Sequence, residues 1–87
     1  MATRAQRERW REEGARLAQA AERAREEARR GQAAGLAGIA PIVPVSRYIW
    51  VGLLDELGWA AGRGELPGGV RRLALEMAEE ILAEPPD

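Results

Sequence analysis

An all-α fold of three helices, the first longer than the other two, is predicted by two features of the sequence. Apolar residues recur every three or four positions in three stretches, and segments rich in Gly or Pro separate these stretches. The chain has 87 residues, which fits one small domain with a limited core. We therefore expect a long N-terminal amphipathic helix and two shorter helices that follow an apolar connector.

The first helix is expected within residues 1–31, from Thr3 to about Arg30. Apart from one glycine it contains no helix breaker, and Ala, Glu, Arg and Leu all favour helices. A stripe of small and large apolar residues follows heptad-like spacings of three and four, and it comprises Trp10, Gly14, Leu17, Ala21, Ala24 and Ala28. We expect this seam to pack against another helix, either of the same chain or of a second copy.

The connector is expected at residues 32–46, which carry no charge and are rich in Gly and Ala. Two prolines interrupt it, and a residue that precedes proline is disfavoured in the α region. We therefore expect an extended chain over Ile39–Val45, lying across the core. Ser46 is a suitable N-cap for the second helix.

A helical pair is expected over residues 47–84, with a Gly/Pro loop at 62–69 and a short tail at 85–87. The main apolar face of the second helix is expected to be buried, and it contains Ile49, Trp50, Leu53, Leu54, Leu57, Ala60 and Ala61. The third helix is expected to bury Val70, Leu73, Ala74, Met77, Ala78 and Ile81.

Catalysis is not expected, because the chain lacks His, Cys and Lys. The hydroxyl groups of Thr3, Ser46 and Tyr48 have no base at a recognisable spacing. A phosphate-binding loop motif is also missing. Glu76, Glu79 and Glu80 share one helix face, which is more typical of a solvated surface than of a metal site. We expect no catalytic residues, no cofactor and no metal.

The composition also bears on the source of the chain and on its location. Lys, Asn and Phe, which have AT-rich codons, are absent, whereas Ala, Gly, Arg and Pro are abundant. This pattern favours a GC-rich bacterium, or a phage or plasmid within one. The N-terminus lacks the order of a signal peptide, and no uncharged stretch reaches the roughly 20 residues of a membrane-spanning helix. We expect a cytoplasmic protein without a membrane partner.

The aromatic content points to protein binding, because Trp and Tyr are favoured at the centres of interfaces. On the second helix, Tyr48 and Trp59 fall outside the main apolar face. If the connector does not cover them, they form a patch with a neighbouring valine. The leading hypothesis is a small adaptor, inhibitor or assembly factor that binds another protein or a second copy of itself. The candidate partner-binding residues are Tyr48, Val51, Trp59, Trp10, Leu17 and Ala21.

Two alternatives remain open. One is a regulator that binds nucleic acid through an edge of the first helix lined by Arg4, Arg7, Arg11, Arg25 and Arg29. Interleaved glutamates and an acidic third helix disfavour this alternative. The other alternative is a homo-oligomeric scaffold.

Overall fold

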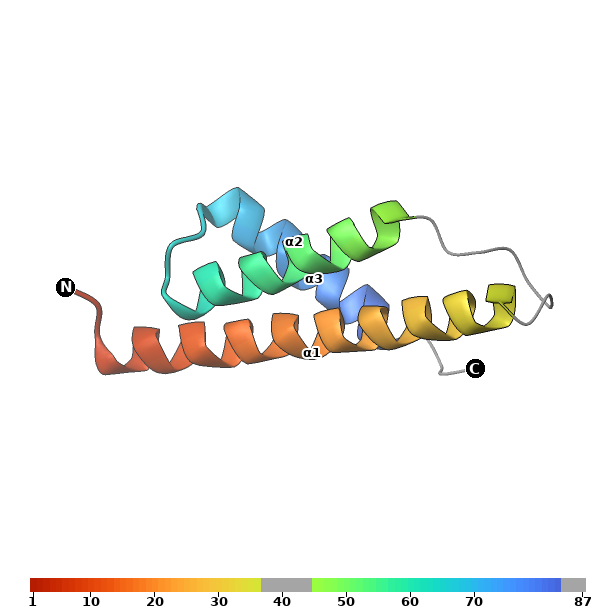
Figure 1. Ribbon diagram of the computed structural model, residues 1–87. Coiled ribbons are helices and arrows are strands. Elements are labelled where there is room, and N and C mark those ends of the chain that lie inside the picture. The colour runs from red at the N-terminus through yellow and green to blue at the C-terminus, as the bar shows by residue number, and fades with distance from the viewer. Residues whose placement is uncertain (37–44, 84–87) are drawn as a thin grey trace.

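Three helices make up most of the described chain (Figure 1). We describe residues 1–36 and 45–83 of a computed structural model, and within these ranges the side chains outside residues 31–47. Helix α1 spans Arg4–Leu36, α2 spans Val45–Gly62 and α3 spans Gly68–Ala83. The predicted three-helix, all-α fold with a long N-terminal helix is confirmed.

The connector is shorter than predicted, because α1 runs on to Leu36 and α2 begins at Val45. Ala28, Ala33 and Ala34 lie within one turn of Gly31, and they favour the helix and offset the cost of about 1 kcal/mol that a glycine imposes inside it. The predicted N-cap Ser46 therefore lies within α2. Most of the segment that we expected to be extended, Ile39–Val45, lies outside the described residues, as does the tail at 85–87.

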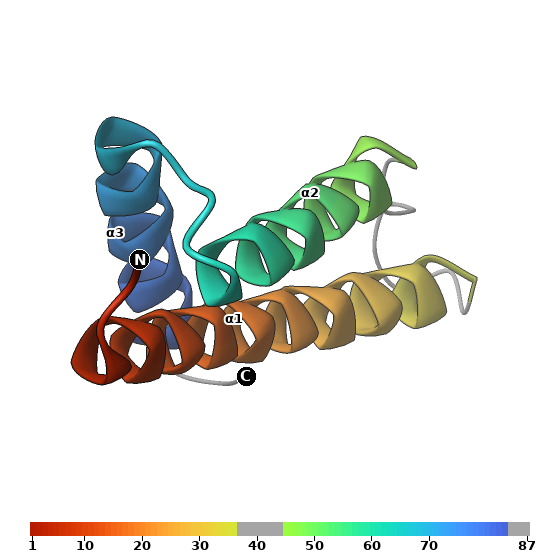
Figure 2. The ribbon, with the colours of Figure 1, turned by 90° about the vertical axis from the view of Figure 1, so that its left-hand side faces the viewer.

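The helices are arranged around α1. Helix α2 lies alongside α1 and runs in the opposite direction, whereas α3 crosses α1 at a steep angle (Figure 2). Helices α2 and α3 each pack on α1 but hardly contact each other. The two shorter helices therefore diverge from a common base on the long one.

The first turn of α1 is closed by a reciprocal pair of side-chain hydrogen bonds. The backbone N–H of Gln6 donates to Thr3 Oγ1 at 3.0 Å, and the backbone N–H of Thr3 donates to Gln6 Oε1 at 2.9 Å. Such a capping box satisfies backbone donors that have no partner within the helix. The start of α1 is therefore set by local sequence.

Glycines bring α1 and α2 unusually close together. A Cβ atom added at Gly14 would lie 2.8 Å from the carbonyl oxygen of Gly58 and 3.0 Å from the Cα atom of Gly62. One added at Gly58 would lie 3.3 Å from the carbonyl oxygen of Gly14. The backbones of the two helices therefore touch where side chains normally keep helices 8–10 Å apart.

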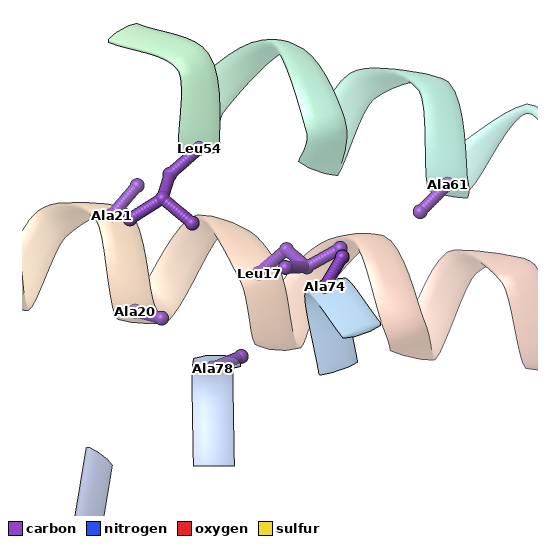
Figure 3. Close-up of a cluster of buried hydrophobic side chains, with 7 residues drawn as sticks. All are labelled: Leu17, Ala20, Ala21, Leu54, Ala61, Ala74 and Ala78. Atoms are coloured by element: carbon purple, nitrogen blue, oxygen red, sulfur yellow. The ribbon is translucent and has the colours of Figure 1, made fainter. Parts of the chain in front are cut away.

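The core is small and consists mostly of alanine (Figure 3). Leu17 and Leu54 are the only large side chains that are fully buried among the described residues. The cluster comprises Leu17, Ala20, Ala21, Leu54, Ala61, Ala74 and Ala78. The seam predicted on α1 thus packs against α2 and α3 of the same chain. Because alanine buries little apolar area, this core stabilises the fold weakly for its size.

A glycine-dependent turn joins α2 to α3. Gly64 has a φ of +70°, which favours glycine. The N–H of Gly64 donates to the carbonyl of Ala61 at 3.0 Å, and the N–H of Glu65 donates to that of Ala60 at 2.9 Å, which is the Schellman pattern. The ring of Trp10 packs directly against Gly64, since a Cβ atom there would lie 2.5 Å from the indole. The turn is thereby fixed to the start of α1.

Two ion pairs attach α3 to α1. Arg71 donates two hydrogen bonds to Glu13, one of them at 2.6 Å, and Arg16 donates to both oxygens of Glu79 at 2.7 and 3.0 Å. The hydrogen bonds from Arg71 and Arg16 lower the pKa values of Glu13 and Glu79, respectively. The ionised form of both carboxylates is therefore favoured in the folded protein.

The predicted buried face of α2 is wrong in its bulky residues. Ile49, Trp50 and Leu53 are exposed, whereas a stripe with spacings of three, four and three residues is buried, comprising Val51, Leu54, Gly58 and Ala61. A seam of glycine and alanine on α1 accepts a close neighbour only where that neighbour also presents small side chains. Helix α2 therefore turns Gly58 and Ala61 toward the glycine contact and Leu54 into the core, and it leaves Ile49, Trp50 and Leu53 outside.

A similar correction applies to α3. Ala74 and Ala78 are buried and Met77 and Ile81 are partly buried, as predicted. Val70 and Leu73, however, are exposed, because the first turns of α3 extend beyond its crossing with α1 (Figure 2).

Candidate interaction surfaces

The first candidate surface is formed by large apolar side chains on the diverging parts of α2 and α3. We call it the α2–α3 apolar face, and it comprises Ile49, Trp50, Leu53, Val70 and Leu73. Ile49 is 69% exposed, Leu53 54% and Leu73 58%. These fractions are high for aliphatic side chains in a chain whose core is mostly alanine.

The two halves of this face share a base in the core. On α2, Leu57 follows Trp50 and Leu53 by seven and four residues, and on α3, Met77 follows Leu73 by four. These spacings place the residues on continuous helix ridges. Leu57 and Met77 are partly buried against the core cluster. The exposed apolar residues therefore continue two ridges that begin in the core and diverge outward with their helices.

The second candidate surface is a hollow on the other flank of α2, with a volume of about 490 Å³. We call it the Trp59 hollow. It forms where the α1–α2 glycine contact leaves space beside the two helices. Its lining residues are Arg11, Gly14, Ala15, Ala18, Asp55, Gly58, Trp59, Gly62 and Arg63. Trp59 is 67% exposed, which is unusual for the largest apolar side chain.

The charges around this hollow are predominantly positive. Asp55 is bound by Arg25 of α1, so its charge is compensated. Arg63 makes an exposed pair with Glu65 at 2.9 Å. Arg11 forms no ion pair with any other residue that the structure describes. The hollow therefore combines a small-residue floor and an indole with at least one uncompensated guanidinium.

The arginine edge predicted on α1 is largely neutralised. Arg4 pairs with Glu8 at 3.3 Å, Arg29 pairs with Glu26 at 3.3 Å, and Arg25 contacts Glu22 as well as Asp55. Within the described residues, Arg7 and Arg11 alone of the five have no ion pair. The edge thus offers a phosphate backbone two free cations near its N-terminal end.

The six residues predicted to bind a partner have different surroundings. Leu17 and Ala21 are fully buried and Val51 is 4% exposed, so these three belong to the intramolecular core and offer a partner no surface. Trp10 packs on the turn at Gly64. The Tyr48 hydroxyl donates to the carbonyl of Ala28 at 3.3 Å, although the ring is partly exposed. Of the six, Trp59 offers the most open surface.

Sequence reasoning missed the α2–α3 apolar face, because it assigned these residues to the core. The signal that marks their exposure was present in Gly58 and Gly62, which are one helical turn apart on α2, and in Gly14 on α1; together they form a close helix contact. Such a contact is incompatible with Trp50 at its centre. Periodicity alone did not connect the glycines of α1 with those of α2.

Two further findings restrict the classes of site. None of the helices in residues 1–36 and 45–83 has the length and apolar character needed to cross a lipid bilayer. In the same parts of the chain, no three acidic side chains converge in a way that would hold a metal ion.

Comparison of the chain with protein-family models, curated proteins and solved structures finds no match.

Proposed function

We propose that this chain is a non-catalytic protein-interaction protein, an adaptor, inhibitor or assembly factor, which binds its partner through the α2–α3 apolar face. One observation carries the proposal: five large apolar side chains lie exposed on two helices, while alanine fills most of the core. Within each helix these side chains recur at spacings of three or four residues, so each helix presents an apolar ridge. Exposed apolar residues are normal when they are scattered singly, whereas apolar residues that gather on one surface are typical of binding surfaces.

The energetics support the same conclusion. Burying an aliphatic side chain of this size contributes about 1.5–3 kcal/mol when burial is complete. Among the described residues, the core contains two such side chains in full burial, Leu17 and Leu54. A partner that covers Ile49, Leu53 and Leu73 would add three large aliphatic side chains to the two that are fully buried in the described core. Binding would therefore stabilise the fold as well as form the complex.

Site-specific photo-cross-linking tests the proposal. The photoreactive residue p-benzoylphenylalanine replaces Leu53, and in a matched control it replaces Glu12, an exposed residue of α1. We expect irradiation of cells that carry the protein to give a protein adduct at position 53, and no such adduct at position 12. Adding Leu73→Glu should abolish the adduct, because it places a charge on the same face. Equal labelling at both positions, or an adduct at 53 that tolerates Leu73→Glu, contradicts the proposal.

The mass of the adduct distinguishes a hetero-complex from a homo-oligomeric scaffold. An adduct of twice the chain mass, together with self-association of the purified protein in sedimentation equilibrium, assigns the face to a second copy. An adduct of any other mass identifies a different protein. Both outcomes keep the protein-binding function and separate it from the nucleic-acid alternative, which predicts cross-links at Arg7 and Arg11.

A further inference from the structure

The Trp59 hollow lies on a different part of the surface from the α2–α3 apolar face. Within α2, Trp59 follows the buried Gly58 by one residue, whereas Trp50 precedes the buried Val51 by one. At 100° per residue, these positions fall on opposite flanks of the buried stripe. The hollow therefore remains open when a partner covers the α2–α3 apolar face.

The floor of the hollow is suited to a bulky apolar group. Gly14, Gly58 and Gly62 hold the two helix backbones in contact, and Ala15 and Ala18 add no side chain beyond Cβ. The volume of about 490 Å³ is within the range of small-ligand and side-chain pockets. The indole of Trp59 stands beside it with two thirds of its surface exposed. An aromatic ring that enters here would stack on or against this indole.

The rim of the hollow is suited to a carboxylate. Arg11 forms no ion pair with the described residues, and the partner of Arg63 is Glu65, in a pair in which both side chains are more than half exposed. An exposed pair of this kind contributes little and exchanges readily. A guanidinium binds a carboxylate through two parallel hydrogen bonds. The one acidic residue in the lining, Asp55, is already bound by Arg25.

From this combination we infer that the Trp59 hollow binds an acidic, aromatic segment of a partner protein. The aromatic side chain occupies the space beside Trp59, and a neighbouring carboxylate pairs with Arg11 or Arg63. The inference rests on the protein-binding function proposed above and adds a second contact of defined chemistry.

A peptide fits this flank of α1 better than a nucleic acid does. A single carboxylate needs only one guanidinium, whereas a run of phosphates along the helix would also meet Glu8 and Glu22. These glutamates compensate Arg4 and Arg25, respectively. Single-stranded nucleic acid also requires several stacking platforms along a basic groove, and Trp59 is the one aromatic residue in the lining of this hollow.

A matched pair of blocked peptides tests the inference on the full chain. Acetyl-Glu-Phe-Glu-amide carries the proposed chemistry, and acetyl-Gln-Phe-Gln-amide has the same size without the charges. Binding is followed by the backbone amide resonances of Gly58 and Gly62, with the indole resonance of Trp50 as an internal reference. We expect the acidic peptide to bind with a dissociation constant on the order of 1 mM and the neutral peptide to bind about fivefold more weakly. The Trp50 resonance should not move.

Three variants establish which groups act. Arg11→Gln should weaken binding of the acidic peptide about threefold and leave the neutral peptide unaffected. Arg72→Gln, the matched loss of one positive charge on an exposed part of α3, should change neither. Ala18→Leu should fill the hollow and abolish binding of both peptides. Ala18 is exposed on a helix, so this variant should retain the circular dichroism spectrum of the parent.

Equal binding of the two peptides, unchanged binding in Ala18→Leu, or no shift at Gly58 and Gly62 overturns the inference. So does an oligothymidylate that binds the hollow more tightly than the acidic peptide in an Arg11-dependent manner, since this assigns the site to nucleic acid. Leu53→Glu should leave peptide binding unchanged. If no adduct forms at position 53 but the acidic peptide still binds the Trp59 hollow, the proposal for the α2–α3 apolar face alone is refuted. If the adduct forms but the peptide does not bind, the inference about the Trp59 hollow alone is refuted.

Discussion

Substituting Gly14 with alanine probes the close contact between α1 and α2, from which both candidate surfaces follow. The added Cβ atom would lie 2.8 Å from the carbonyl oxygen of Gly58, whereas ordinary van der Waals contact begins at about 3.4 Å. The obstructing atom belongs to the backbone, so it can move only if α2 moves as a whole. The helices must separate by about 0.6 Å at this point, and a gap of that size loses a quarter to a half of the dispersion energy across the seam.

The magnitude follows from two opposing effects. Alanine stabilises a helix by about 1 kcal/mol relative to glycine, and overpacking against an immobile neighbour costs about 1–3 kcal/mol. For Gly14→Ala the two effects leave a net loss of about 1 kcal/mol, within a range of about 0–2 kcal/mol, in the free energy of unfolding. Gly52→Ala is the matched control, because Gly52 also lies within a helix and its added Cβ atom would meet nothing within 4 Å. That control should gain about 0.5–1 kcal/mol.

Thermal unfolding followed by circular dichroism measures the difference. For a domain of this size, each kcal/mol shifts the melting temperature by about 4–8 °C. The two variants differ by about 1.5–2 kcal/mol, so Gly14→Ala should melt roughly 6–16 °C below Gly52→Ala. If the two variants melt together, above the parent, the helices are not in backbone contact at Gly14 and the account of the exposed face of α2 fails with it.

Three other predictions concern the turn, the exposed indole and the ion pairs. In chemical denaturation, Gly64→Ala should lower the free energy of unfolding by at least about 1 kcal/mol. The positive φ at this position disfavours alanine, and the added methyl group would meet the ring of Trp10. Stability equal to that of the parent would contradict the turn geometry. Trp59→Ala should change the free energy of unfolding by only about 0.5 kcal/mol, because the indole is largely exposed. Loss of a buried Trp would instead cost about 3–5 kcal/mol. The pKa values of Glu13 and Glu79 are lowered in the folded protein by their hydrogen bonds from Arg71 and Arg16. These carboxylates therefore contribute stability above the ordinary pKa of a glutamate and lose it as the pH falls through their folded pKa values. Denaturation at neutral and acidic pH should therefore show a smaller loss on acidification for the double variant Glu13→Gln/Glu79→Gln than for the parent; an equal loss would show that other carboxylates dominate acid unfolding.

The sequence by itself determined the helices and the seam on the first of them. Helix-forming residues, the spacing of apolar side chains and the Gly/Pro segments are local properties, and they placed the centres of α1, α2 and α3 correctly. The seam was identified because Leu17, Ala21 and Ala28 repeat with the helical period, and all three are buried. The end of α1 was placed too early, because Gly31 was given more weight than the alanines around it.

Only the tertiary structure decided which face of α2 is buried. Hydrophobicity ranks Trp50, Ile49 and Leu53 above Val51 and Ala61, yet the smaller residues face the core. The choice depends on the shape of the opposing surface, which belongs to another segment of the chain. Because Gly14 lets the backbones of α1 and α2 touch at Gly58, small side chains fit between the helices there. Of the large apolar residues of α2, Leu54 is buried, whereas Ile49, Trp50 and Leu53 remain on the outside.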